Sequence, residues 1–194
     1  LKEPFTYRML ADHARMLRTT KGKHCYSFVG LDYAVWDWMR IGVFTGSRLA
    51  EYAQSNLRAT QRYQMIPNNE DSGQWAGMAL AFIPDDFQFF DHNNCLVPKD
   101  NLLSIHKKND IHMVHIRFRF DKSKTNFSIR KFTTTDDTIL DPVDAAVSIL
   151  RRAEMLGVPS NEPVGVYSKK DDASFSFIRD YNITPIMRQT FVRA

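Results

Sequence analysis

The most restrictive pattern in the sequence is the alternation of apolar and polar side chains over residues 111–120, which is regular from Val114 to Phe120. A β-strand points successive side chains to opposite faces, so this alternation predicts a strand that is buried on one face only. Residues 127–132 alternate again, and the polar residues 121–126 join the two stretches. They predict an antiparallel hairpin at the edge of a half-buried sheet, with Lys122 and Lys124 in its turn. The expected core face carries Val114, Ile116, Phe118 and Phe120.

Helical periodicity occurs on both sides of this hairpin. Apolar side chains recur at helical spacing in 7–17, 31–44 and 143–156, and the second of these stretches is apolar enough to be a buried helix. Thr6 is a suitable N-cap for the first helix, and Asp141 followed by Pro142 suits the start of the third.

The remaining elements are shorter. Residues 86–91 suggest another strand, 48–54 a restarted helix, and Thr184 with Pro185 the cap of a last helix. The order of helices, a short sheet and further helices predicts one α+β domain over residues 1–194, mostly helical with a small antiparallel sheet or hairpin.

Composition and charge exclude several classes of protein. No apolar run approaches the roughly 18 residues of a spanning helix, and we expect no membrane partner. Cys25 and Cys95 stand far apart, which favours an intracellular location and gives neither a disulfide framework nor a metal motif. The formal net charge is +4, yet residues 99–131 hold nine Lys or Arg and three Asp, a net +6. Such a basic stretch is either a solvated face or a footprint for phosphates.

The segment from Thr45 to Glu51 carries the clearest chemical signal. Thr45 and Gly46 break two helical stretches, which frees backbone N–H groups, and Arg48 stands at the new helix start. Glu51 follows one turn later, where it can pair with Arg48 and orient its guanidinium. A fixed, forked donor beside open N–H groups suits a phosphate, although an ordinary surface Arg–Glu pair has the same sequence.

Taken with its neighbours, this segment resembles a known family. Thr-Gly-x-Arg-x-x-Glu after a buried helix resembles the first arginine box of tyrosine recombinases, the phage-integrase-like enzymes that break and rejoin DNA. About 75 residues further on, Asp121-Lys122-Ser123-Lys124-Thr125 resembles the turn of the family's β-hairpin. The segments 2–6 and 141–145 resemble the entry to the catalytic domain and the helix after the hairpin. Taken together, these motifs are most similar to those of recombinases from DIRS-type or Crypton-type mobile elements.

The resemblance implies specific roles. Arg48 would grip the scissile phosphate, with Glu51 as its support. Lys124 would protonate the leaving 5′ oxygen, with Lys122 as the competing assignment. A tyrosine attacks DNA in this family without metal or cofactor, so we expect neither here. Residues expected to contact the DNA are Thr45, Gly46, Lys122, Arg130 and Lys131. The implied partners are duplex DNA and, in the full-length parent, further copies on that DNA; the location would be nuclear in a eukaryote.

The sequence also departs from the family. No His is followed three residues later by Arg, and the tyrosines after the hairpin, Tyr167 and Tyr181, follow no such box. We expect either that the chain is truncated before both motifs or that it is a decayed or domesticated copy, and that this chain alone does not cleave DNA. The alternatives are a non-catalytic DNA-binding module derived from such an enzyme, and a protein-interaction domain whose basic hairpin is only solvated.

Two other features have weaker interpretations. His112 and His115 have a spacing that suggests a metal, but on a strand it points their rings to opposite faces. Trp36 and Trp38 are either base-stacking platforms or, as we favour, part of the core.

Overall fold

The computed structural model describes residues 7–19, 27–46, 81–99, 102, 110–118, 127–137, 139–169, 174–179 and 181–186. Its main sheet has four strands in the order β2-β1-β3-β4. They are β1 (Phe87–Phe90), β2 (Leu96–Val97), β3 (Met113–Phe118) and β4 (Ser128–Thr133), and all neighbours are antiparallel. The expected strand at 86–91 and the pairing of 111–120 with 127–132 are therefore confirmed, while the turn 121–126 lies outside the described residues.

Burial within the sheet follows the alternation of the sequence. On β3, Val114, Ile116 and Phe118 are buried, while the residues between them are half-buried. Pairing places Phe87 of β1 opposite Ile116, and Phe89 opposite Val114, so the same face is apolar across the neighbouring strand. β4 lies at one edge, as the half-buried pattern predicted. The expected Phe120 lies outside the described residues.

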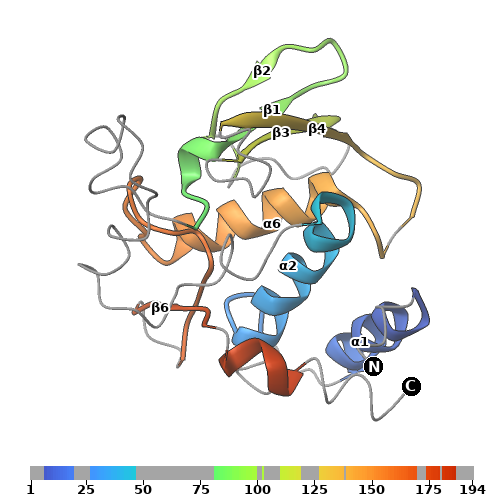
Figure 1. Cartoon of the computed structure of the whole chain (residues 1–194), viewed down its shortest axis with the longest axis vertical. Coiled ribbons are helices and arrows are strands. Elements are labelled where there is room, and N and C mark those ends of the chain that lie inside the picture. Colours follow the sequence, from blue (N-terminus) through green and yellow to red (C-terminus); the bar gives the residue numbers. More distant parts are fainter. Residues whose placement is uncertain are drawn as a thin grey trace, which may run out of the picture.

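Helix α6 (Pro142–Met155) covers the apolar face of the sheet, contacting β3 and β4 (Figure 1). Its start follows the sequence signal: the Asp141 carboxylate accepts a hydrogen bond from the Asp144 N–H at 2.8 Å, and Pro142 occupies the first turn, where a missing N–H costs nothing. After the helix, Gly157 adopts a positive φ of 66°, which the absence of a side chain permits.

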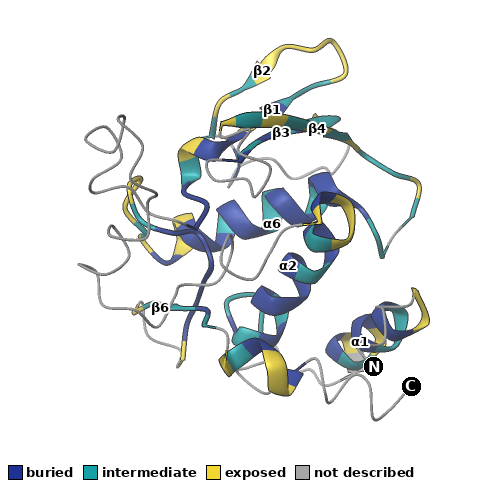
Figure 2. Ribbon diagram, in the orientation of Figure 1, coloured by how far each residue is buried: buried dark blue, intermediate teal, exposed yellow. Residues whose placement is uncertain are grey.

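Two further helices build outward from α6. α2 (Leu31–Thr45) packs on α6, and α1 (Tyr7–Thr19) packs on α2 at the far side from the sheet (Figure 1). The predicted helices at 7–17, 31–44 and 143–156 are thus confirmed. Figure 2 shows that dark, buried segments concentrate where α2 and α6 face the sheet. Trp36 and Trp38 are both buried, which confirms the core interpretation of these aromatics.

One local expectation was wrong, and one short element was not recognised. The helix expected to begin at Thr184 already includes residues 181–186, so Thr184 lies within it and is not its N-cap. The apolar run around Val166, for which the sequence offered no strand signal, forms the strand β5 (Val166–Tyr167) and pairs with β6 (Ser176–Phe177). Short strands of two residues carry too little alternation to be recognised in a sequence.

The fold is therefore a mixed α+β fold with a small antiparallel sheet. Within the residues described, none of the helices has the length and apolar character needed to span a membrane.

Candidate nucleic-acid interface

Four of the predicted site residues belong to the described part of the chain: Thr45, Gly46, Arg130 and Lys131. The other four, which include the proposed phosphate-gripping arginine and the hairpin lysines, lie outside it. They are Arg48, Glu51, Lys122 and Lys124. Of the predicted site, the structure therefore describes the end of α2 and the strand β4.

The end of α2 is fixed by its own backbone. Gly46 terminates the helix in the left-handed conformation, with φ 62° and ψ 21°, and its N–H donates to the Gly42 carbonyl at 2.9 Å. Thr45 is buried, and its hydroxyl donates to the Ile41 carbonyl at 3.0 Å. The Thr-Gly break predicted from the sequence is thus an ordered helix terminus of the left-handed glycine type.

Arg130 joins this terminus to the hairpin. Its side chain is half-buried, and its Nη1 donates to the Thr45 carbonyl oxygen at 2.6 Å. Its guanidinium carbon lies 4.2 Å from the centroid of the Phe118 ring, on the neighbouring strand β3. A cation is favourable near the carbonyl end of a helix, and it also gains from stacking on an aromatic face. The structure therefore brings together two of the predicted segments, which are 85 residues apart in the sequence.

Lys131 occupies the opposite, open face of the sheet. It is exposed and pairs across the ladder with His115. Burial, and then the charge of Lys131, lower the pKa of His115. On the same face, Arg117 is already engaged: its Nε donates to the buried Asp86 carboxylate at 3.1 Å. Alternation along β4 thus separates two neighbouring basic residues, one turned toward α2 and one toward solvent.

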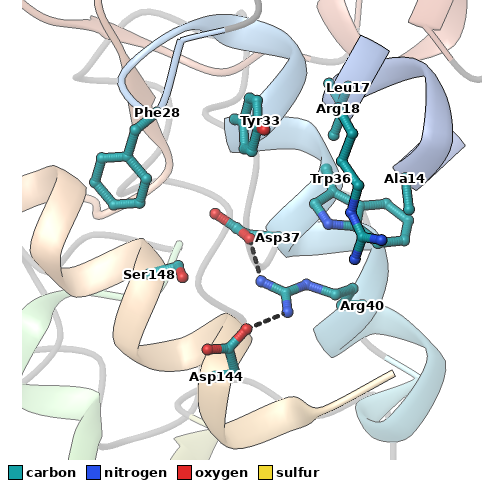
Figure 3. A pocket seen from close by; sticks show the side chains of 10 residues that line it. All are labelled: Ala14, Leu17, Arg18, Phe28, Tyr33, Trp36, Asp37, Arg40, Asp144 and Ser148. Atoms are coloured by element: carbon teal, nitrogen blue, oxygen red, sulfur yellow. Dashed lines mark hydrogen bonds and ion pairs between the residues drawn. The ribbon is translucent and has the colours of Figure 1, made fainter. Parts of the chain in front are cut away.

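A second charged cluster lies in the interior and was not recognised from the sequence. Arg40 of α2 contacts Asp37 on its own helix at 2.5 Å and Asp144 of α6 at 2.6 Å (Figure 3). Asp37 also forms an ion pair with Arg152 of α6. Burial opposes the charge on Arg40, but the two carboxylates outweigh it and raise its pKa. The i, i+3 spacing of Asp37 and Arg40 could have predicted an ion pair on α2, but only the apolar residues of this stretch entered the prediction from the sequence.

This cluster borders a small cavity of about 220 Å³ between α1, α2 and α6. Trp36 and Phe28 line it, together with Arg40 and Asp37, and these two rings each have an arginine over them: Arg40 on Trp36 and Arg152 on Phe28. The charged groups of the cluster pair with one another. We therefore interpret the cluster as a connection between α2 and α6.

His112 and His115, the two histidines considered as metal ligands, pack against different side chains. His112 stacks on His92 with ring centroids 4.6 Å apart, and its Nδ1 lies 3.1 Å from the Thr134 hydroxyl. His115 instead packs on Phe90, with 4.3 Å between the ring centroids. Across the part of the chain that the structure describes, no group of three His, Cys, Asp or Glu side chains is arranged to hold a metal ion.

Comparison with known proteins adds no relative. No protein-family model, no curated protein and no solved structure matches this chain.

Proposed function

We propose that this chain binds duplex DNA as part of a tyrosine-recombinase-like catalytic domain, whose full-length parent breaks and rejoins DNA strands. The observation that carries the proposal is the hydrogen bond from Arg130 to the Thr45 carbonyl oxygen. It brings the end of α2, which precedes Arg48 in the sequence, beside β4, which follows Lys122 and Lys124 in the sequence. A phosphate held by both motifs requires this proximity.

The distribution of charge also supports a DNA partner. Residues 99–131 carry a net charge of +6, and the rest of the chain sums to −2 because the total is +4. Lysine and arginine gathered in one stretch favour phosphates and release counterions on binding. An intracellular location, nuclear in a eukaryote, and assembly of several copies on DNA belong to the same proposal.

The proposed chemistry assigns each group one task. A tyrosine hydroxyl of the parent gives its proton to a base of the parent and attacks the scissile phosphorus; a P–O bond forms to the tyrosine and the bond to the 5′ oxygen breaks. Arg48 stabilises the negative charge that develops on the phosphate oxygens. Lys124, or Lys122, gives its proton to the leaving 5′ oxygen, which it does more readily when nearby arginines lower its pKa. Rejoining reverses these steps.

DNA binding is tested by the fluorescence anisotropy of a labelled 30-base-pair duplex, titrated with the chain at several salt concentrations. We expect Lys122→Gln and Lys124→Gln to weaken binding by a similar factor on unrelated sequences. A variant that loses a phosphate contact should lower the slope of log affinity against log salt by about 0.9. Arg8→Gln is the matched control, because Arg8 is exposed on α1, away from the sheet (Figure 1).

Strand breakage is tested on a parent in which this segment is followed by a His-x-x-Arg box and a tyrosine. We expect a covalent protein–DNA adduct with a nicked suicide substrate, and no adduct after Arg48→Ala. Salt-sensitive binding without an adduct would instead favour the non-catalytic DNA-binding module. No binding at about 50 mM salt, where phosphate contacts are strongest, would refute both and leave the protein-interaction domain.

A further inference from the structure

Arg130 is directed away from solvent by the register of the sheet. It pairs with Ile116 and shares its face of β4 with Ser128 and Phe132, which pair with the buried Phe118 and Val114. Its guanidinium lies over Phe118 and bonds to the Thr45 carbonyl oxygen. A side chain that contacts DNA phosphates through the same guanidinium would have to leave at least part of this arrangement.

The Thr45 carbonyl oxygen, which accepts this hydrogen bond, is a group that needs a partner from outside its helix. The last carbonyls of an α-helix lack an intrahelical N–H partner, and a basic side chain can satisfy them. Thr45 is 3% exposed, so its carbonyl lies in a place where a lost hydrogen bond is not freely replaced by water. Only Gly46 and Ser47 separate Thr45 from Arg48 in the sequence.

We propose that Arg130 is a positioning residue, which holds the end of α2 against the hairpin so that Arg48 and the hairpin lysine reach one phosphate. This inference rests on the proposed function and replaces the expectation that Arg130 contacts DNA directly. Arg130 acts through the Thr45 carbonyl on one side and through β4 on the other. Lys131, the next residue, lies on the open face and has no such role.

The variants follow from this geometry. Arg130→Gln removes the charge and shortens the side chain, so that the bond to Thr45 is lost. Arg130→Lys keeps a cationic hydrogen-bond donor but loses the planar guanidinium. It should therefore retain part of the hold on the Thr45 carbonyl. Lys131→Gln is the matched control, since it removes the same charge from the adjacent, exposed position.

The first measurement needs no DNA. Amide hydrogen exchange of the peptide 43–50 reports how firmly the end of α2 is held. We expect Arg130→Gln to accelerate this exchange roughly tenfold, Arg130→Lys to accelerate it less, and Lys131→Gln to leave it unchanged. Exchange in α6 should stay the same in all three variants, which separates a local release from general destabilisation.

The second measurement is a double-mutant cycle on duplex binding. We expect Arg48→Ala to cost about tenfold in affinity in the otherwise unchanged chain, and less than about threefold when Arg130→Gln is also present. Arg130→Gln alone should weaken binding while leaving the salt slope unchanged, because no phosphate contact is removed. A purely structural role for Arg130 predicts no coupling to Arg48.

Three results would overturn the inference. Unchanged exchange in Arg130→Gln would show that the contact does not hold the helix end. Additive effects with a salt slope lowered by about 0.9 would show that Arg130 binds phosphate directly. If the unchanged chain binds no duplex while the exchange effect persists, the proposed function fails, and Arg130 then serves the fold alone.

Discussion

Asp37 of α2 and Arg152 of α6 form an ion pair in the interior, and neither side chain is more than 3% exposed. The same carboxylate accepts from Arg40, whose second partner is Asp144. Asp37 thus pairs with two buried arginines at once, so the packing of α2 on α6 depends on its charge.

Asp37→Asn should therefore be strongly destabilising. Removing one member of a buried ion pair leaves an uncompensated charge, and here two guanidinium groups lose a partner at once. We expect a loss of about 3–5 kcal/mol in the free energy of unfolding, measured by urea denaturation. Asp12→Asn is the control, because Asp12 pairs with the exposed Arg8 and Arg15 and should cost less than about 1 kcal/mol. Equal losses for the two variants would contradict this role of Asp37.

The ring of His13 gives the fold a dependence on pH. His13 is 1% exposed and packs against Trp36, with 5.5 Å between the ring centroids and the two rings tilted by 30°. Burial lowers its pKa from 6.5 to about 4, and a backbone contact with Asp32 offsets this only in part. Between these values the unfolded chain binds a proton that the folded chain does not. The contribution of the uncharged His13 to the free energy of unfolding is then fully present above pH 6.5, and it decreases as the pH falls toward 4.

The size of this effect follows from the shift, about 3 kcal/mol over that interval at 1.36 kcal/mol per pKa unit. We expect urea denaturation of the unchanged chain to show this loss between pH 6.5 and 4. His13→Gln should remove that part of the pH dependence while lowering stability at neutral pH. An identical pH profile in the variant would assign the effect to other groups.

The two glycines near the end of α2 should respond to alanine with opposite signs. Gly46 has a φ of 62°, which disfavours any residue with a Cβ, whereas Gly42 lies within the helix. Neither added Cβ meets a heavy atom within 4 Å, so the effect comes from the backbone alone. Gly46→Ala should destabilise by about 1 kcal/mol and Gly42→Ala should stabilise by roughly 0.5–1 kcal/mol, as measured by thermal unfolding. The same sign in both would show that the left-handed terminus is not maintained.

The cap of α6 provides a fourth test. The buried Asp141 carboxylate accepts from the N–H of Asp144 at 2.8 Å and from that of Thr135 at 3.3 Å. Asp141→Ala leaves both donors without this partner and should cost about 1–2 kcal/mol in urea denaturation. Asp141→Asn keeps one side-chain oxygen and should cost less than half as much. A smaller loss for alanine than for asparagine would contradict the capping role.

Much of the secondary structure was predictable, because it depends on local periodicity. The alternation in 111–118 gave the buried face of β3, and Asp141 with Pro142 marked the start of α6. Val43 is an instructive exception: it fits the apolar spacing of α2 but is 48% exposed. The short pair β5 and β6 offered no comparable period.

The predicted site was recoverable only in part. Thr45 and Gly46 form the helix break that the sequence indicated, and Arg130 lies on the strand expected for it. That Arg130 turns inward while Lys131 turns outward depends on which face of β4 is covered. The functional assignments of Arg48, Glu51, Lys122 and Lys124 fall outside the described residues and stay predictions.

The sequence by itself determined the helices, the alternation of the hairpin and the break after Thr45, because each depends on residues within a few positions of one another. Only the tertiary structure decided which distant groups meet. Arg130 reaches Thr45 across 85 positions, and Arg152 reaches Asp37 across 115. Such contacts depend on how α2, α6 and the sheet pack, and no local period encodes that packing. The concentration of basic residues in 99–131 could be read from the sequence, but the pairing of Arg40 and Arg152 with Asp37 in the interior could not.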